Sequence, residues 1–580
     1  MASNKTNKNQ KQNQAIVRIV LMVAILICAN ILASYFHRGI DLTKEKRFTL
    51  SDPTKKLLHN MKEVAVVDVY LKGKFPSGLQ RLQEAVRERL TSFRDIAGNK
   101  IIFRFSDPFE GKTDEEKKQI GIDLRQKGIV PLELRTSDEE EFTAKLFFPY
   151  ALIQYNGKEM SVKLTEQMAG RTSEENISYS ETILEYKFAS ALNIMGKPDL
   201  AHLAYVTGNG EPLGVNTYDM LSSLGHRYWL DTIDLRKGTQ ISLAYDAILI
   251  VQPTDTFTGP EKLKIDQYVM RGGHVLFSLN TLQASVDSLV RSPSFIAMEY
   301  PLELDDLIYR YGARVNKDMV VDIQNMQLGR VMNDGPPTLH NWIYYPKLNP
   351  TSDHPIVRNM DFIRAGFTNS IDTILSPGIK KTVLLSTSKY SLKYQSPVRV
   401  NMGMMNYPLK EEMFNKSYLP VAVLLEGKFR SAFTNKLAPS YLKVLHDSLH
   451  QDFKAVCDSE NKIIITSIGD AFINTYNKRD GYQPMDYYFW TKEYFANRDF
   501  LLNCIEYLTD KTNILESRSK EMKLRLLDNG RVKDEKTTWQ VVNVAIPVAI
   551  VLVFASAYFF FRKRRYEIKS NDIKPTSGNV

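Results

Sequence analysis

Two long runs of uncharged, apolar residues stand near the two ends of the chain. Residues 19–36 form a run of 18, or of 22 when counted from Ala15, and residues 541–561 form a run of 21. An α-helix rises about 1.5 Å per residue, so each run can cross a hydrocarbon core of about 30 Å. The pattern predicts transmembrane helices over 15–36 and 541–561. A cleaved signal peptide is the alternative for the first run, but no convincing small-x-small cleavage site follows it.

Between these runs, residues 45–170 alternate between strand-like and helix-like patterns. A short helix is expected after Ser51 or Asp52, with Pro53 in its first turn. The pattern further predicts strands at 64–71, 100–105, 131–136, 142–155 and 159–164, and helices at 78–96 and 114–127. This β-α-β-α-β-β order is typical of a thioredoxin-like domain. The redox cysteines of such enzymes are missing, so the likeness concerns the scaffold only.

Residues 174–510 show the same alternation with longer periods. The pattern predicts helices at 177–194, 215–224 and 261–270, and strands at 201–207, 229–235, 246–251 and 274–279. Apolar strands that alternate with amphipathic helices indicate a parallel sheet covered on both faces. We therefore predict an α/β protein in which two terminal transmembrane helices flank an N-terminal thioredoxin-like domain and a parallel-sheet domain.

The second half of this domain is less regular. Residues 324–460 contain many prolines, and we expect a long irregular insertion there, with an edge hairpin at 421–433. The run at 462–468 predicts a late strand that rejoins the sheet, and the run at 497–508 a closing helix. Residues 511–538 form a juxtamembrane segment whose stretch 514–527 is basic and amphipathic. That stretch could lie on the bilayer surface, but a spacer to the second anchor is favoured.

The positive charge of the chain lies in its two tails. The formal net charge is +10, of which residues 1–20 and residues 562–580 carry +4 each. The body is thus nearly neutral and has no bulk field to attract a nucleic acid. The run from Arg562 to Arg565 follows the second apolar run and predicts a cytoplasmic basic tail at 562–580. With two crossings, the low-complexity tail 1–14 is cytoplasmic and disordered, and the body lies outside a bacterial inner membrane, in the periplasm.

The best candidate for a binding site is the sequence Gly208-Asn209-Gly210-Glu211, directly after the predicted strand 201–207. Ligands of open α/β sheets bind beyond the carboxyl ends of the strands, and glycines let a backbone approach a ligand closely. A small molecule or glycan fragment is the expected ligand. The alternative is a tight turn that needs positive φ at the glycines, with Glu211 capping the next helix.

No catalytic constellation is found. Gly111-Lys112-Thr113 resembles the end of a P-loop, but Ser106 stands where the first glycine is required, so an exposed turn is expected. The sequence has no GxSxG elbow. His446 and His450 have a spacing that can share a metal ion, but no third ligand is evident. Cys457 and Cys504 could form a disulfide, although two free buried thiols are favoured. We therefore predict no enzyme activity, no metal and no cofactor.

Several stretches together resemble one family. They are RFTLSDPTKKLL (47–58), YVTGNGEPLG (205–214), the stretch 234–280, LLEGKFRSAF (424–433) and SIGDAFIN (467–474). Their order between two terminal anchors is similar to that of the auxiliary, so-called substrate-binding subunit of the gliding-motility ABC transporter of Bacteroidetes, the GldG family. The resemblance implies a sheet like that of glutamine-amidotransferase-like domains. It also implies a permease and a separate cytoplasmic ATPase as partners, and a role in surface motility.

The expected function is therefore that of a membrane-anchored auxiliary subunit of an ABC transporter. The alternative is a structural envelope scaffold that recruits proteins through residues 324–460 and binds no small ligand.

Overall fold

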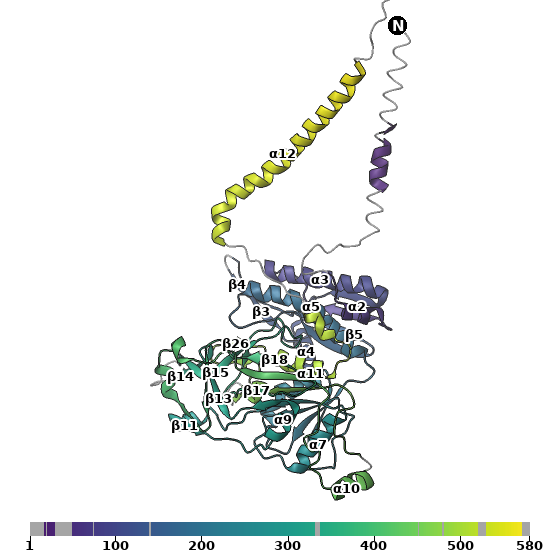
Figure 1. The fold of residues 1–580 in the computed structure, drawn as a ribbon. Helices are drawn as coiled ribbons and strands as arrows, with labels where there is room; N and C mark the ends of the chain where they lie inside the picture. The colour runs from purple at the N-terminus through teal and green to yellow at the C-terminus, as the bar shows by residue number, and fades with distance from the viewer. Residues whose placement is uncertain are drawn as a thin grey trace, which may run out of the picture. The chain divides into compact units, whose positions relative to one another are not determined.

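The computed structural model describes residues 17–18, 20–28, 49–73, 75–138, 141–330, 337–449, 452–477, 481–519 and 529–570 (Figure 1). The chain forms two compact units, Met1–Met522 and Lys523–Val580. The first unit contains a four-stranded and a ten-stranded sheet. The second contains a long helix, α12 (Asn529–Ser570). The mixed α/β character with parallel strands confirms the predicted fold class in that general form.

The four-stranded sheet belongs to the N-terminal part of the first unit. Its strands lie in the order β2-β1-β5-β6, with β1 parallel to β2 and β5 antiparallel to both β1 and β6. The strands are β1 (Ala65–Val69), β2 (Ile101–Phe105), β5 (Tyr150–Tyr155) and β6 (Lys158–Lys163). The accompanying elements are α2 (Asp52–His59), α3 (Ser77–Ala97), α4 (Asp114–Gln126) and the hairpin β3 (Leu132–Asp138) with β4 (Glu141–Phe147). The thioredoxin-like assignment of 45–170 stays a prediction.

Pro149 divides the single strand predicted over 142–155 into two. Proline has no N–H to donate to a strand ladder. β4 ends at Phe147, and the Tyr150 N–H donates to Phe148 O at 2.9 Å. β5 then pairs with β1, whereas β4 pairs with β3. The prediction of one strand was therefore wrong.

The parallel half of the ten-stranded sheet has the order β8-β7-β9-β10-β22. Its strands are β7 (His202–Thr207), β8 (Trp229–Asp234), β9 (Ala247–Val251), β10 (His274–Ser278) and β22 (Asn461–Thr466). Numbered along the chain, this is the order 2-1-3-4-5 of a doubly wound sheet. β22 confirms the late strand that rejoins the sheet.

Side chains of these strands alternate between two hydrophobic clusters, one on each face. Leu203, Tyr205 and Leu249 belong to the cluster that includes residues of α6 (Tyr218–Gly225) and α11 (Asn497–Thr509). Ala204 and Ile248 belong to the cluster that includes residues of α7 (Gly259–Met270) and α9 (Asp305–Tyr311). Helices therefore cover both faces, as the near-continuous apolar runs of the strands predict.

The antiparallel half of the sheet corrects two predictions for residues 324–460. It consists of β14 (Asn325–Arg330), β15 (Thr338–Pro350), β18 (Ile379–Ser386) and β21 (Pro420–Gly427), with the short β16 (Ile363–Arg364) beside β15. β21 is not an edge hairpin, because it pairs with β18 on one side and with β22 on the other. The region is also not an irregular insertion, because its strands extend the main sheet.

This half has its own hydrophobic cluster, which includes the fully buried Trp342. Two short ladders contribute to it: β11 (Ser294–Ala297) with β20 (Val398–Asn401), and β13 (Asp318–Asp322) with β19 (Ser391–Gln395). A third, β12 (Ala313–Val315) with β17 (Ile371–Thr373), belongs to the cluster of α7 and α9. Two further hairpins are β23 (Tyr476–Asn477) with β24 (Gly481–Tyr482) and β25 (Tyr487–Tyr488) with β26 (Glu493–Tyr494). The remaining helices include α8 (Ser288–Arg291) and α10 (Pro439–Leu449).

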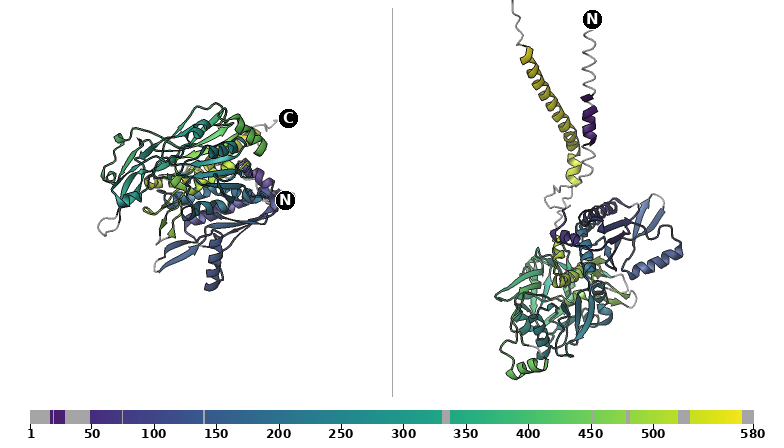
Figure 2. Two further views of the ribbon diagram at one scale, coloured as in Figure 1. Left: turned by 90° about the horizontal axis from the view of Figure 1, so that it is seen from below. Right: turned by 90° about the vertical axis from the view of Figure 1, so that its right-hand side faces the viewer.

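Helix α5 (Ser173–Gly196) joins the N-terminal part to the large sheet, two parts that lie side by side in Figure 2. Arg81 of α3 forms ion pairs with Glu174 and Glu181 of α5. On another side, the Tyr186 hydroxyl donates to Oε2 of Glu506 in α11 at 2.5 Å. α5 thus contacts elements of both parts.

The segment η6 (Ile514–Ser519) corrects the interpretation of 514–527 as a surface or spacer helix for the first six residues of that stretch. Ile514, Leu515 and Arg518 are buried, and Arg518 Nη2 donates to the Tyr179 hydroxyl of α5 at 2.9 Å. Ile514 and Leu515 therefore pack into the core of the first unit. Residues 520–528 lie outside the described residues.

Within the described residues, one stretch, Thr538–Arg564 of α12, is long and apolar enough to cross a membrane. The residues of its most apolar part are not buried. It includes the predicted span 541–561. Of the first predicted span, residues 17–18 and 20–28 are helical and exposed, and the others lie outside the described residues. The two-pass topology stays a prediction. Cys457 and Cys504 are free and buried, which confirms the prediction of unpaired thiols.

We predict that Tyr186→Phe destabilises the first unit. The substitution removes a hydrogen bond to the buried Glu506 carboxylate, which keeps the bond from Ser190 Oγ at 2.9 Å. The free energy of unfolding should fall by about 1–3 kcal/mol in urea denaturation. Tyr407→Phe is the control, because Tyr407 is 63% exposed, and it should change that free energy by less than about 0.5 kcal/mol. Equal effects of the two substitutions would contradict the role given to Tyr186.

Candidate functional site

The turn Gly208–Glu211 lies where the strand order of the parallel sheet reverses. β7 ends at Thr207, with β8 on one side of it and β9 on the other. The chain passes from β7 to β8 in one direction and later from β9 to β10 and β22 in the other. Ligands of doubly wound sheets bind at this switch point, beyond the carboxyl ends of the strands. The four predicted site residues therefore occupy the expected position for a site.

Both glycines of the turn are required by the backbone and by the available space. Gly208 has φ 114° and Gly210 has φ 81°. A Cβ atom on Gly208 would lie 2.5 Å from Asp234 Oδ1, and one on Gly210 would lie 2.0 Å from Thr254 Oγ1. The positive-φ turn considered as the alternative is therefore present, packed against the end of β8 and the loop that follows β9.

The loop that follows β9 closes the switch point over Asn209, which is only 2% exposed. The Asn209 carbonyl accepts hydrogen bonds from the N–H groups of Thr254 at 3.0 Å and Asp255 at 2.9 Å. Its Nδ2 donates to Thr256 O at 3.1 Å and to Glu261 Oε2 at 3.3 Å. The chain's own atoms thus fill the place that a ligand takes in an open switch point.

Glu211 is a buried carboxyl group in this turn, with 8% of its surface exposed. Its Oε2 accepts from the Asn209 N–H at 2.8 Å, so it bonds back into the turn and does not cap the following helix. Oε1 of Glu211 and Oδ1 of Asn209 are buried without a hydrogen-bond partner among the described residues. Burial raises the pKa of Glu211 to about 7, and nearby Asp255 adds to the rise. The turn can therefore gain or lose a proton near neutral pH.

A second buried carboxyl group, at Asp470, lies beyond the end of β22 and was not among the predicted site residues. Asp470 Oδ2 accepts from the Gly366 N–H at 2.8 Å, and burial raises its pKa to about 6. The neighbouring Gly469 N–H donates to Asn280 Oδ1, beyond the end of β10, at 2.9 Å. The signal that could have identified these residues is the polar residue that follows each buried strand.

The other motifs considered in the sequence have structural roles here. Thr113 caps α4 in a capping box with Glu116, and residues 111–113 are an exposed turn, as predicted. His446 Nδ1 lies 2.8 Å from Asp452 Oδ1 at the surface, and His450 lies outside the described residues. The residues that the structure describes contain no group of three or more His, Cys, Asp or Glu side chains able to hold a metal ion.

Comparisons with known proteins match nearly the whole chain. A sequence family described as "ABC-type uncharacterized transport system" matches residues 201–504, from the start of β7 into α11. A domain of unknown function, DUF7088, matches residues 44–154. An uncharacterized protein of Borreliella burgdorferi is 20% identical over 570 residues, which cover 96% of this chain and 99% of that protein. Among solved structures, the mmIFT52 N-terminal domain aligns with 13% identity and a TM-score of 0.30, over 53% of this chain and 97% of that one.

We predict that Gly210→Ala destabilises the protein. The new Cβ would collide with Thr254 Oγ1, and alanine is strained at φ 81°. The free energy of unfolding should fall by about 1–3 kcal/mol. Gly225→Ala is the control, because its Cβ would meet nothing within 4 Å and its φ is not in the left-handed region. A Gly210→Ala variant as stable as the control variant would show that the loop 254–258 does not close tightly on this turn.

We also predict that Glu211 makes stability depend on pH. The unfolded chain releases the Glu211 proton near pH 4.5, whereas the folded chain holds it until about pH 7. Stability therefore falls as pH rises through this window, by up to about 3 kcal/mol, because ionisation inside the turn is unfavourable. Glu211→Gln should remove the Glu211 contribution and leave that of other buried carboxyl groups such as Asp470, so the variant should be as stable as the wild type at pH 4.5 and more stable at pH 8. Parallel stability–pH curves of the two proteins would contradict the assignment.

Proposed function

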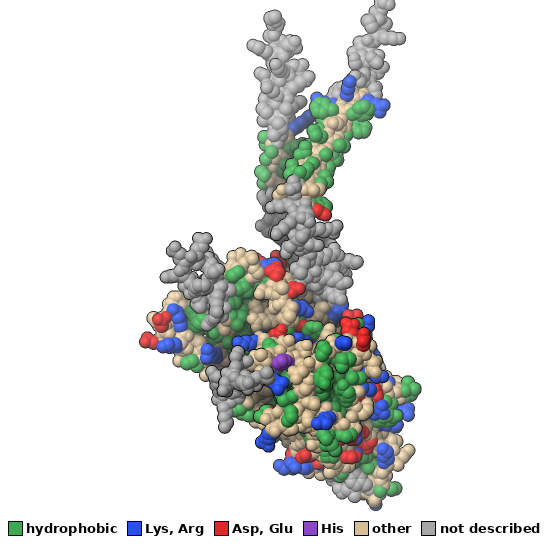
Figure 3. All heavy atoms as spheres, turned by 90° about the vertical axis from the view of Figure 1, so that its left-hand side faces the viewer, with side chains coloured by type: hydrophobic (Ala, Val, Ile, Leu, Met, Phe, Trp, Pro, Cys, Tyr) green, Lys and Arg blue, Asp and Glu red, His purple; other side chains and the backbone are tan. Residues whose placement is uncertain are grey.

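Since the chain belongs to the family of ABC-type uncharacterized transport systems, we propose that it is a membrane-anchored, non-catalytic auxiliary subunit of an ABC transporter. The main observation in support of membrane anchoring is the exposed apolar surface of α12. Residues 538–564 would span about 40 Å at about 1.5 Å per residue, which exceeds the ~30 Å of a hydrocarbon core. Figure 3 shows hydrophobic side chains along this helix.

The charge at the end of α12 supports an orientation for the proposed span. Arg562, Lys563 and Arg564 follow the apolar residues on the same helix, and Figure 3 shows basic side chains at that end. Basic residues that flank a membrane helix favour the cytoplasmic side. In our proposal the C-terminal tail is cytoplasmic and the folded body lies outside the inner membrane. A first anchor at 15–36 also crosses that membrane.

A body on the outer side needs partners that couple it to ATP. The only partial P-loop match of the sequence, Gly111-Lys112-Thr113, lies in the turn that caps α4. We therefore assign ATP hydrolysis to a separate cytoplasmic ATPase and translocation to a permease. The resemblance of residues 205–214, 234–280, 424–433 and 467–474 to the GldG family supports the more specific proposal that this transporter serves gliding motility.

An exposed apolar patch beside the switch point supports contact with a protein partner. It consists of five side chains that are 45–54% exposed: Leu213, Val215, Tyr218, Tyr476 and Tyr482. The rings of Tyr218 and Tyr482 lie 4.7 Å apart, and Asn474 Nδ2 donates to Val215 O, which joins the two segments of the patch. Exposed apolar groups of this kind mark interaction surfaces, in which tyrosine is often a dominant contributor.

We predict that the tagged full chain, extracted in mild detergent from its native host, copurifies with a permease and an ATPase. The double variant Tyr218→Ser/Tyr482→Ser should lower the recovered permease about tenfold or more, because truncation of interface tyrosines commonly costs 1–2 kcal/mol each. Tyr407→Ser is the matched control, because Tyr407 is 63% exposed and lies outside the patch. Recovery of neither partner from wild-type extracts would contradict the transporter role and favour the envelope-scaffold alternative.

A further inference from the structure

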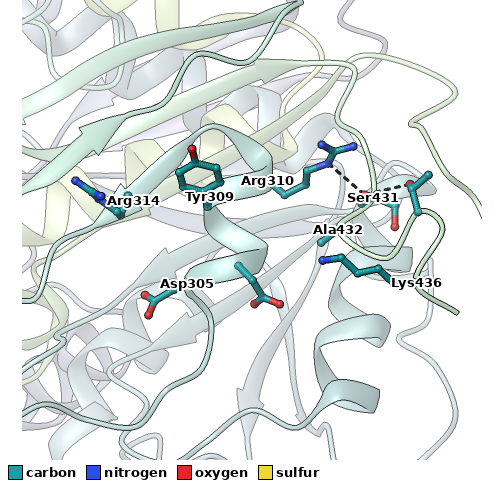
Figure 4. A pocket seen from close by; sticks show the side chains of 9 residues that line it. Asp305, Tyr309, Arg310, Arg314, Ser431, Ala432 and Lys436 are labelled. Carbon is teal, nitrogen blue, oxygen red and sulfur yellow. Dashed lines mark hydrogen bonds between the residues drawn. The ribbon is translucent and has the colours of Figure 1, made fainter.

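A surface pocket separate from the switch point lies between α9 and the loop that follows β21 (Figure 4). Its volume is about 490 Å³, which is in the range of small-molecule sites. α9 and the residues after it contribute Asp305, Asp306, Tyr309, Arg310 and Arg314, and the loop contributes Ser431, Ala432, Thr434 and Lys436. The two walls are thus more than 100 residues apart in the sequence.

A buried carboxylate holds the loop wall in place. Asp266 of α7 is fully buried, and it accepts hydrogen bonds from Ser431 Oγ at 2.6 Å and from the Ala432 N–H at 2.9 Å. The Tyr311 hydroxyl of α9 donates to the same carboxylate at 3.2 Å, so Asp266 connects both walls. The pocket is therefore built by packed elements and is not a chance gap between surface side chains.

A tight turn then places Lys436 at the pocket. The Lys436 N–H donates to Phe433 O at 3.0 Å, and Asn435 has φ 63°. Asparagine tolerates this left-handed conformation, which a type II turn requires at its third residue. Figure 4 shows the Lys436 side chain extending from this turn toward the α9 side of the pocket.

Each acidic residue of the pocket has a lysine nearby, but Lys317 is shared with Glu299, which lies 3.1 Å from its Nζ. Asp306 pairs with Lys262 Nζ at 2.9 Å, and Asp305 lies 3.5 Å from Lys317 Nζ. Arg314, at the other end, pairs with Asp372 at 2.7 Å. Asp306 and Arg314 are therefore balanced by single partners, whereas Asp305 keeps part of its negative charge because it shares Lys317 with Glu299.

Arg310 and Lys436 are the cations that remain. Arg310 Nε donates only to the Ser431 carbonyl, at 3.4 Å, and among the described residues neither cation has a carboxylate within ion-pair distance. Both side chains line the pocket, and Figure 4 shows the Arg310 guanidinium above Ala432 and Lys436 below it. The terminal nitrogens of Arg310 and the ammonium of Lys436 thus provide donors for an anion.

We propose that this pocket binds a small phosphate-bearing molecule, with Arg310 and Lys436 holding the phosphate group. A guanidinium donates two parallel hydrogen bonds to phosphate oxygens, and an ammonium adds a point charge. Thr434 and the exposed Tyr309 stand at the same pocket, where the organic part of the ligand would lie. The group could belong to a soluble phosphomonoester or to a phospholipid headgroup, and both present negatively charged phosphate oxygens.

Calorimetric titration of the full chain in detergent micelles tests the site. Glycerol 3-phosphate represents the phosphomonoester, and glycerophosphoglycerol represents a lipid headgroup without its acyl chains. We expect saturable binding of at least one probe. Arg310→Gln and Lys436→Gln should each weaken it about tenfold or more, since hydrogen bonds between charged groups are the strong ones. Lys118→Gln is the charge-matched control, because Lys118 is an exposed lysine of α4, and it should bind as the wild type does.

The comparison of probes identifies the source of the phosphate group. Tighter binding of glycerol 3-phosphate indicates a soluble phosphomonoester, and tighter binding of glycerophosphoglycerol indicates a lipid headgroup. Arg310→Lys keeps the charge and should retain part of the affinity, and unchanged thermal unfolding of each variant shows that the fold is intact. The proposal is overturned if neither probe binds at millimolar concentration, if both Gln variants bind as the wild type does, or if acetate binds as tightly as the phosphate probes. These outcomes do not depend on any contact with a permease.

Discussion

The burial of α5 is the constraint on which the rest of the first unit depends. Fifteen of its 24 residues are buried, so this helix must be covered on most of its sides. α3 covers it from the N-terminal part through the ion pairs of Arg81, and α11 covers it from the large sheet through Glu506. η6 adds Arg518 against Tyr179. Neither part could leave α5 without exposing apolar surface, which explains why the N-terminal part and the family-matched region form one compact unit.

This arrangement is consistent with the auxiliary role that we propose. The switch point, which is an open ligand crevice in many doubly wound sheets, is closed here by Asn209 and the loop after β9. The buried carboxyl groups of Glu211 and Asp470 lie at the same edge of the sheet, and burial raises the pKa of each. A pocket of about 490 Å³ lies elsewhere, between α9 and the loop after β21, where cationic groups are available. Partner contact and protonation of Glu211 would thus involve the switch-point region, and anion binding would use a separate part of the body.

The sequence predicts those features that depend on local pattern. The periodicities that identify α3, α7 and α11, and the apolar runs of β7, β9 and β10, are visible in single segments of the chain. The position of Gly208–Glu211 beyond a strand end is equally local. The predictions failed where distant segments decide the outcome. In the sequence, the residues of β21 form an isolated apolar run. Only the pairing of β21 with β22 and β18 shows that it is a central strand.

The same limit applies to the sites. That the loop 254–258 fills the switch point depends on contacts between Asn209 and residues about 45 positions later, which no local pattern reveals. The pocket proposed to bind phosphate is harder to predict, because Arg310 and Lys436 are brought to one pocket only by the fold that Asp266 stabilises. Pro149 is a different case, since a proline inside a strand pattern is itself a signal that the strand ends.

The central claim is that α12 holds the folded body on the outer side of the inner membrane. The most direct measurement is the protease sensitivity of the full chain, followed with antibodies against the body and against the C-terminal tail. In intact spheroplasts, added protease should digest the body and leave the tail, and in inside-out vesicles it should remove the tail and leave the body. A body that is protected in spheroplasts and digested in inside-out vesicles would contradict the account.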